Sequence, residues 1–144
     1  MNNVKLAATE KEIIEIIELR YKVLRQPWQQ LKETATDNLE LVSLNAYIND
    51  ESGKVIACGR LQKNSDETGQ IRFMAVDNFH QSKGLGNMIV SFLEDEGKKI
   101  GLKKIELQAR ENAVEFYKKA GYTIKEKTFL LWGIIQHFLM EKEI

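Results

Sequence analysis

The stretch Gln70–Gly86, QIRFMAVDNFHQSKGLG, joins an apolar strand pattern to a helix start that contains two glycines. Apolar residues alternate from Ile71 to Ala75 and predict a buried strand. After a short polar turn, residues 81–86 open a strongly amphipathic helix. Glycines at a helix start leave backbone N–H groups uncovered, and the helix dipole favours an anion there. The stretch therefore predicts a site for the phosphate or pyrophosphate of a phosphorylated cofactor.

The overall composition narrows the class of protein. The 144 residues are expected to form one domain over 1–144 with a sizeable core. The 21 basic residues balance the 21 acidic ones, which argues against binding to nucleic acid. There is no signal-peptide pattern and no apolar run near the ~20 residues of a membrane span, so we expect a cytoplasmic protein that binds no membrane. The single cysteine, Cys58, fits a reducing compartment, and we expect a core residue rather than a nucleophile.

The N-terminal part of the chain predicts a strand, a helix and a long loop. Residues 4–7 are a short apolar strand pattern. Thr9 and Glu12 match a capping box, and the helix that they start must end before Pro27. Residues 26–38 have no sustained period and are expected to form a loop, and a loop of this length is often functional.

The rest of the chain alternates between strand and helix patterns. Residues 41–48 and 55–62 are expected to pair antiparallel through the turn 49–53. The later predicted elements are a helix over 85–100 closed by Gly101, a strand over 104–109, a short helix from Glu111 or Asn112 to Gly121, and strands over 122–131 and 134–141. A strand–helix–strand unit of this length implies a parallel pair. We predict an α/β fold of the α+β type: a mixed, mostly antiparallel sheet of about six to seven strands, a parallel β-α-β unit in its middle, and helices on both faces.

Two common phosphate-binding motifs fail on spacing. A dinucleotide-binding fingerprint needs glycine or alanine at the position of Ile89, and no acidic residue ends the next strand as that motif requires. A P-loop needs Gly-Lys-Ser/Thr, whereas this chain has Gly86-Asn87-Met88. Neither motif explains the two glycines.

Residues 81–86 (QSKGLG) resemble the acyl-CoA-binding motif Gln/Arg-x-x-Gly-x-Gly/Ala of the GCN5-related N-acetyltransferase (GNAT) superfamily and match every defined position. Residues 112–122 (NAVEFYKKAGY) resemble its second landmark, in which Asn is followed by Phe-Tyr and then by Gly-Phe/Tyr. Small single-domain bacterial members also carry Val-Leu-Arg, Gly-Arg-Leu and Gly-Ile-x-His-x-x-Met segments, similar here to 23–25, 59–61 and 133–140. The last segment has one extra residue between Gly133 and His137. The resemblance covers nearly the whole chain.

This resemblance implies an N-acyltransferase that moves an acetyl group from acetyl-CoA to a primary amine of a small molecule or peptide. Transfer would be direct, without a covalent enzyme intermediate and without a metal. The resemblance implies the following cofactor-binding residues: Met74, Ala75, Val76, Gln81, Ser82, Lys83, Gly84, Leu85, Gly86, Asn112, Phe116 and Tyr117. Main-chain groups of Met74 and Val76 would bond the pantetheine arm. Met74 is equally explained as a core residue, and Asn112 as a helix N-cap.

Two side chains are candidates for proton transfer. Tyr117 is the candidate general acid, because a hydrogen-bonded phenol can protonate or steady a leaving thiolate; the alternative is an aromatic residue packed under its helix. His137 is the candidate base, because histidine can accept an amine proton near neutral pH; a packed histidine is the alternative. Asp37, Glu40 and an ordered water chain are further candidate bases. With two histidines and no clustered ligands, no metal site is expected.

Arginines and a tryptophan are the candidates for the acceptor site. Arg25 and Trp28 begin the loop that lines the acceptor pocket in this superfamily, and we assign Arg72 to the same site. Arg72 and Arg110 lie on or beside the two parallel strands, where each could be structural or could hold an anionic substrate group. The identity of the amine, the acyl preference beyond acetyl and a homodimer stay open. Two other classes also stay open: a catalytically silent CoA-binding sensor or regulatory module, and an interaction domain without cofactor.

Overall fold

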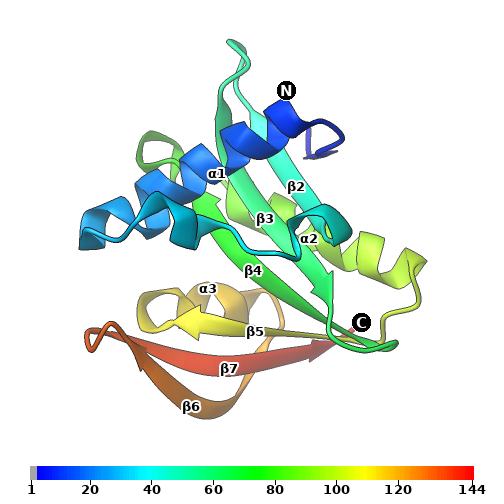
Figure 1. Cartoon of the computed structure of the whole chain (residues 1–144). Helices are drawn as coiled ribbons and strands as arrows, with labels where there is room; N and C mark the ends of the chain where they lie inside the picture. The colour runs from blue at the N-terminus through cyan, green and yellow to red at the C-terminus, as the bar shows by residue number, and fades with distance from the viewer. Residues whose placement is uncertain (1–2) are drawn as a thin grey trace.

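Seven strands within residues 3–144, the part of the chain that the computed structural model describes, form one mixed sheet (Figure 1). Their order across the sheet is β1-β2-β3-β4-β5-β7-β6. The strands are β1 (Lys5–Leu6), β2 (Leu44–Asn49), β3 (Val55–Lys63), β4 (Thr68–Val76), β5 (Lys104–Arg110), β6 (Thr123–Leu131) and β7 (Ile135–Glu143). The α-helices are α1 (Glu10–Leu24), α2 (Leu85–Lys99) and α3 (Val114–Lys119). Short 3-10 turns are η1 (Gln26–Trp28), η2 (Lys32–Ala35), η3 (Glu40–Val42), η4 (Asn78–His80) and η5 (Glu111–Ala113). The predicted order of elements and the mixed sheet are confirmed.

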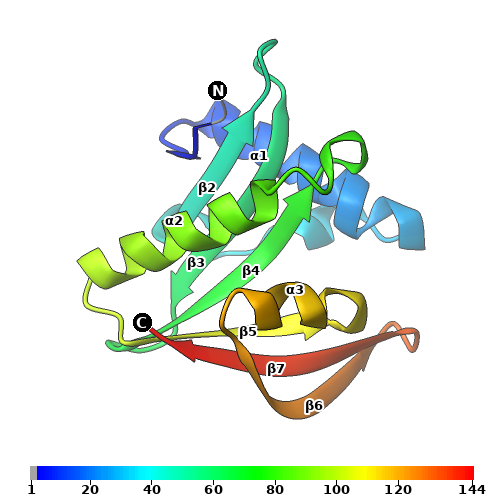
Figure 2. The same ribbon diagram turned by 180° about the vertical axis from the view of Figure 1, so that it is seen from behind.

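Helix α1 begins at the predicted capping box. The Glu12 backbone N–H donates to the Thr9 hydroxyl at 3.2 Å, and the Thr9 backbone N–H donates to the Glu12 carboxylate at 2.9 Å. Ile16 and Leu19 are buried from this helix against β3 and β4. Figure 1 shows α1 lying across one face of the sheet, and Figure 2 shows α2 and α3 on the opposite face. The prediction of helices on both faces is therefore confirmed.

Helix α2 supplies the larger of the two apolar cores. Leu85, Ile89 and Leu93 are at most 2% exposed and pack against buried residues of the sheet such as Ile71 and Leu107. Burying each such side chain contributes about 1.5–3 kcal/mol, so this packing fixes α2 on the sheet and with it the turn that precedes the helix. None of the helices described between residues 3 and 144 has the length and apolar character needed to span a membrane.

The middle of the sheet opens where β4 and β5 separate. These strands pair in parallel from Thr68 opposite Lys104 to Ile71 opposite Leu107, and no pairing follows toward their carboxyl ends. At the same level β4 carries an irregularity, because its register with β3 shifts there and Phe73 has a φ of 55°. A non-glycine residue in this conformation is strained, and bulges of this kind bend a strand. Figure 2 shows the two strands diverging beyond that point.

Several element boundaries differ from the sequence prediction, and two of these differences have a clear structural cause. The second strand begins at Leu44 rather than 41, because residues 40–42 form the turn η3, in which Leu41 is 91% exposed. The short helix after β5 begins as the turn η5, and the N-cap of α3 is Ala113. The N-cap alternative for Asn112 is therefore wrong, since this residue lies inside η5 and makes no capping hydrogen bond.

Candidate active site

A cavity of about 910 Å³ lies where β4 and β5 diverge. Its walls come from elements on both faces of the sheet: the end of α1 and η1 on one side, and the starts of α2 and α3 on the other. Predicted site residues that line it are Arg25, Trp28, Arg72, Met74, Ala75, Val76, Gln81, Ser82, Gly84, Gly86, Asn112, Phe116, Tyr117 and His137. Two others do not line it, because the Lys83 side chain is exposed and Leu85 is buried in the core. The structure thus brings together residues from five distant parts of the sequence.

The turn before α2 has the geometry of an anion site. Gly84 is the N-cap of α2 with a φ of 80°, and a Cβ there would meet no atom within 4 Å, so the turn is open. No side chain caps this helix start and its first turn holds no acidic residue, which leaves the first N–H groups free. A Cβ on Gly86 would lie 3.0 Å from Phe116 Cζ, so this glycine lets the Phe116 ring pack beside the turn. The residues present therefore fit the pyrophosphate of CoA.

Tyr117 projects from α3 to the cavity wall and is 7% exposed. Its ring packs edge-on against Phe116 at 5.0 Å and Tyr122 at 5.9 Å. Burial raises the pKa of the Tyr117 phenol well above its usual range, so the hydroxyl keeps its proton at neutral pH. Within residues 3–144, this hydroxyl has no hydrogen-bond partner. The packed ring agrees with the alternative of an aromatic residue under its helix, while the role of the hydroxyl as a general acid stays a prediction.

His137 lies near the start of β7 and is 5% exposed. Its Nδ1 is 3.0 Å from the backbone oxygen of Ile135, and since a carbonyl only accepts, Nδ1–H is the donor. That bond leaves Nε2 as an acceptor in the neutral ring. The ring stacks on Phe129 at 4.3 Å and 13°. Burial lowers the pKa of His137, with the charges of Arg110 and Arg25 adding to it, and outweighs the opposing effect of the Ile135 bond. A neutral imidazole with a free Nε2 can accept a proton.

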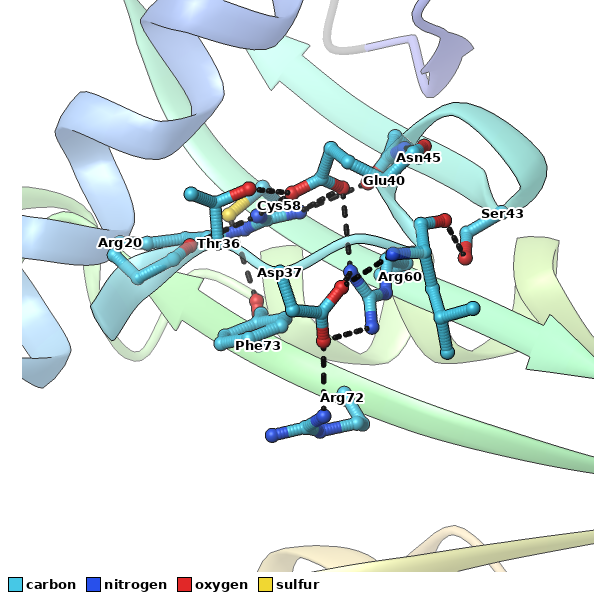
Figure 3. A network of polar contacts seen from close by, with 12 residues as sticks. Arg20, Thr36, Asp37, Glu40, Ser43, Asn45, Cys58, Arg60, Arg72 and Phe73 are labelled. Carbon is cyan, nitrogen blue, oxygen red and sulfur yellow. Dashed lines mark hydrogen bonds and ion pairs between the residues drawn. The ribbon is translucent and has the colours of Figure 1, made fainter. Parts of the chain in front are cut away.

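Asp37 and Glu40 belong to a network of arginines (Figure 3), and neither residue lines the cavity. Arg60 donates two hydrogen bonds of 2.8 Å to the Asp37 carboxylate. The Arg60 bonds outweigh burial and lower the pKa of Asp37 to about 2. Burial is the largest single influence on Glu40 and opposes its ionisation, but the bonds and charge of Arg20, the Thr36 bond and the charge of Arg60 together outweigh it and lower the pKa of this carboxyl. Both carboxylates stay ionised and paired, and they hold the segment between α1 and β2 against the sheet.

Cys58 is a core residue, as predicted. It is 0% exposed, and its thiol contacts the backbone oxygen of Phe73 at 3.6 Å. Burial raises the pKa of Cys58 to about 11, which disfavours the nucleophilic thiolate. In the part of the chain that the structure covers, there is also no group of three or more His, Cys, Asp or Glu side chains arranged to hold a metal ion.

The sequence did not single out two aromatic side chains that lie at the cavity or beside the residues that line it. Trp132 lies in the β6–β7 turn with its ring 6.0 Å from that of Trp28, and Phe129 lines the cavity under His137. Both belong to an aromatic cluster around Gly133, which is the one signal that sequence reasoning had for them. The contact of Trp28 with Trp132 joins residues more than one hundred positions apart, so no local pattern could predict it.

Comparisons with known proteins agree on one family. A family model described as "Acetyltransferase (GNAT) family" matches residues 12–122. The protein YjcF of Bacillus subtilis (strain 168), described as an uncharacterized N-acetyltransferase, is 31% identical over 139 residues, which are 96% of this chain and 97% of YjcF. The crystal structure of a GNAT family acetyltransferase from Elizabethkingia anophelis with acetyl-CoA bound superimposes with a TM-score of 0.81 at 18% identity, covering 99% of this chain and 98% of that one. A putative N-acetyltransferase from Lactobacillus plantarum gives 0.87 at 15% identity, covering 99% and 97%.

Proposed function

Because this chain belongs to the acetyltransferase (GNAT) family, and is thus an N-acetyltransferase that uses acetyl-CoA, we propose that it acetylates a small primary amine held between Tyr117 and His137. The family assignment confirms the resemblance carried by residues 81–86 and 112–122. It also disfavours both alternatives, the silent CoA-binding module and the interaction domain without cofactor.

One observation supports the proposal: a single cavity is lined by all the residues to which we assign a part in the reaction. The open glycine turn at Gly84 and the side chain of Asn112 lie in its wall, and so do the free hydroxyl donor of Tyr117 and the neutral imidazole of His137. Arg25 lines the same cavity at the end of α1. Holding both reactants in one cavity fixes their relative orientation and so reduces the entropic cost of the reaction.

The donor half of this cavity fits acetyl-CoA, which supplies an acetyl group activated as a thioester. The first N–H groups of α2 at Gly84–Gly86 would bind its pyrophosphate. Beyond Ile71 the edge of β4 has no partner in β5, so main-chain groups of Met74 and Val76 are left to bind the pantetheine arm. One N–H group there would polarise the carbonyl that the amine attacks.

Two side chains divide the movement of protons. The amine nitrogen forms a bond to the acetyl carbon as the carbon–sulfur bond breaks, and the nitrogen must lose one proton. His137 Nε2 accepts that proton directly or through a water, and the Tyr117 hydroxyl donates to the leaving thiolate. The net result is an amide and a free thiol, with both side chains restored after proton exchange with solvent.

A free-thiol assay over a panel of small primary amines tests the proposal. With acetyl-CoA present, we expect thiol release that depends on the amine and exceeds slow hydrolysis of the thioester. The acetylated amine should appear in equal amount by mass spectrometry. Tight binding of acetyl-CoA without amine-dependent release from any small amine, but with release on peptides, would contradict a small-molecule acceptor.

A further inference from the structure

Two arginines lie side by side at the end of α1. The Arg25 and Arg110 guanidinium groups each donate a hydrogen bond of 3.0 Å to the same backbone oxygen, that of Leu24. Because both donating nitrogens bond to the same oxygen atom, the distance between them cannot exceed the sum of the two hydrogen-bond lengths. Both side chains are partly buried and line the cavity. Two like charges are held close together here by partly buried side chains.

Neither of these arginines has an acidic partner within residues 3–144. Arg20, Arg60 and Arg72 each form an ion pair with Asp37 or Glu40, whereas no carboxylate of the described chain lies within 4 Å of Arg25 or Arg110. Burial and the nearby charge of Arg25 lower the pKa of Arg110 to about 10. Burial likewise lowers the pKa of Arg25. An unpaired and half-buried pair of cations costs free energy, which a bound anion would offset.

Two tryptophans hold the arginines in place without neutralising them. The Arg110 guanidinium lies 4.6 Å from the Trp28 ring centroid and 5.9 Å from that of Trp132. The Arg25 guanidinium lies 5.6 Å from the Trp132 ring. Figure 1 shows the end of α1 and the β6–β7 turn at the same edge of the molecule, where these rings meet. Aromatic faces attract guanidinium groups and lower the local dielectric, which strengthens any bond to an anion.

The charge of the cavity wall also favours the binding of an anion. Its lining contains three arginines and one histidine, and among the described residues that line it there is no aspartate or glutamate. Arg72 is already paired with Asp37, so the excess positive charge belongs to Arg25 and Arg110. Such a wall repels a polyamine, and guanidinium groups are the preferred partners of carboxylate and phosphate.

We propose that Arg25 and Arg110 form an anion-binding pair that selects an acceptor carrying a carboxylate or phosphate in addition to its primary amine. This inference rests on the proposed function, because it assigns the acceptor to the part of the cavity beside His137. Arg110 pairs with His137 across β5 and β7, so an anion on the arginines brings the rest of its molecule close to the base. An anionic group on the acyl chain of the donor could bind the two arginines instead. The rate measurements described below distinguish these two sources of the anion.

The chain contains a built-in probe, because its only two tryptophans are Trp28 and Trp132. CoA is added first to saturation, so that the glycine turn is filled, and inorganic phosphate is then titrated while tryptophan emission is recorded. We expect a saturable change in the wild type and a phosphate affinity weakened by about tenfold or more in Arg25→Gln and Arg110→Gln, since bonds to charged groups are strong. Lys98→Gln, an exposed change of the same type on α2, should leave the titration unaltered.

Unchanged CoA affinity in both arginine variants shows that they are folded. If the variants are folded, either of two results would overturn the proposal. One is that phosphate does not change the tryptophan emission of the wild type. The other is that Arg25→Gln and Arg110→Gln respond to phosphate as the wild type does. If no amine is acetylated, that result contradicts the proposed function. The phosphate titration would then still show whether Arg25 and Arg110 bind an anion.

Rate measurements separate the two sources of the anion. With acetyl-CoA, the kcat/KM for ethanolamine phosphate should exceed that for ethanolamine by about tenfold or more, and both arginine variants should lose that preference. If the arginines matter only when succinyl-CoA is the donor and ethanolamine the acceptor, the anion belongs to the acyl group and the inference about the acceptor is wrong.

Discussion

His137 owes its chemical state to three neighbouring elements. Phe129 of β6 covers its ring, Arg110 of β5 and Arg25 at the C-cap of α1 place positive charge nearby, and the Ile135 carbonyl fixes which nitrogen is protonated. Burial is the largest cause of the lowered pKa of His137, and protonation would also add a charge to a site that already holds two cations, so the imidazole stays neutral to lower pH than a free histidine. This is the state in which a base is ready to act.

An NMR titration should detect this shift, because the chain has only two histidines. We expect the His137 ring to titrate below the ordinary value of about 6.5, so that the neutral form predominates at pH 7. Arg110→Gln should move the titration toward higher pH, because removing a neighbouring cation makes the imidazolium less unfavourable. A His137 midpoint above 6.5, or one that does not respond to Arg110→Gln, would contradict the electrostatic account.

The proposed role of Tyr117 as a proton donor can be tested with a matched control variant. Tyr117→Phe should lower kcat by about 10²-fold or more, the range of general acid catalysis, with little change in acetyl-CoA affinity. Tyr122→Phe is the control, because its hydroxyl donates to Glu94 at 2.9 Å and does not line the cavity. That variant should keep kcat and lose about 1 kcal/mol of stability. Equal kcat in Tyr117→Phe and the wild type would remove Tyr117 from the mechanism.

At the scale of elements, the bulge in β4 depends on residues far from it in sequence. The Phe73 ring is 8% exposed and lies under the guanidinium groups of Arg20 at 4.5 Å, Arg72 at 4.7 Å and Arg60 at 4.9 Å. Strained backbone costs about 1–3 kcal/mol and persists where the surroundings fix it. Here three arginines from α1, β3 and β4 hold the aromatic ring, and the bulge they stabilise opens the cavity.

The loop between α1 and β2 is fixed by the same network, and Glu40 is its most buried acid. Arg20 and Arg60 are both 0% exposed, so Glu40→Gln would leave buried cations under-compensated and should cost about 3–5 kcal/mol in urea unfolding. Glu18→Gln is the matched control, because its partner Lys32 is exposed, and a surface pair contributes at most about 1 kcal/mol. Similar losses in both variants would show that the network does not stabilise the fold.

At the scale of the whole molecule, the helices and strands could be predicted from local sequence patterns. The candidate site could be predicted from them only in part. The capping box at Thr9, the hairpin turn 49–53 and the periodicity of α2 each depend on near neighbours, and all three are confirmed. Residues 81–86 predicted the donor half of the proposed site because the motif is contiguous. The proposed acceptor half joins Trp28 to Trp132 and two arginines to the Leu24 carbonyl, and these contacts exist only after the sheet has formed.

The placement of acetyl-CoA at the glycine turn is the central claim, and Gly84 and Gly53 allow a matched test of it. Both glycines have a positive φ, of 80° and 91°, and neither has an atom within 4 Å of an added Cβ, but Gly53 lies in the hairpin turn away from the cavity.

Calorimetric titration of acetyl-CoA into the wild type, Gly84→Glu and Gly53→Glu is the most direct measurement. We predict that Gly84→Glu weakens the binding of acetyl-CoA by about tenfold or more, because it places a carboxylate where the pyrophosphate would bind. Gly53→Glu should bind acetyl-CoA as tightly as the wild type does. Binding by Gly84→Glu that equals the wild type, or an equal loss in Gly53→Glu, would contradict the account.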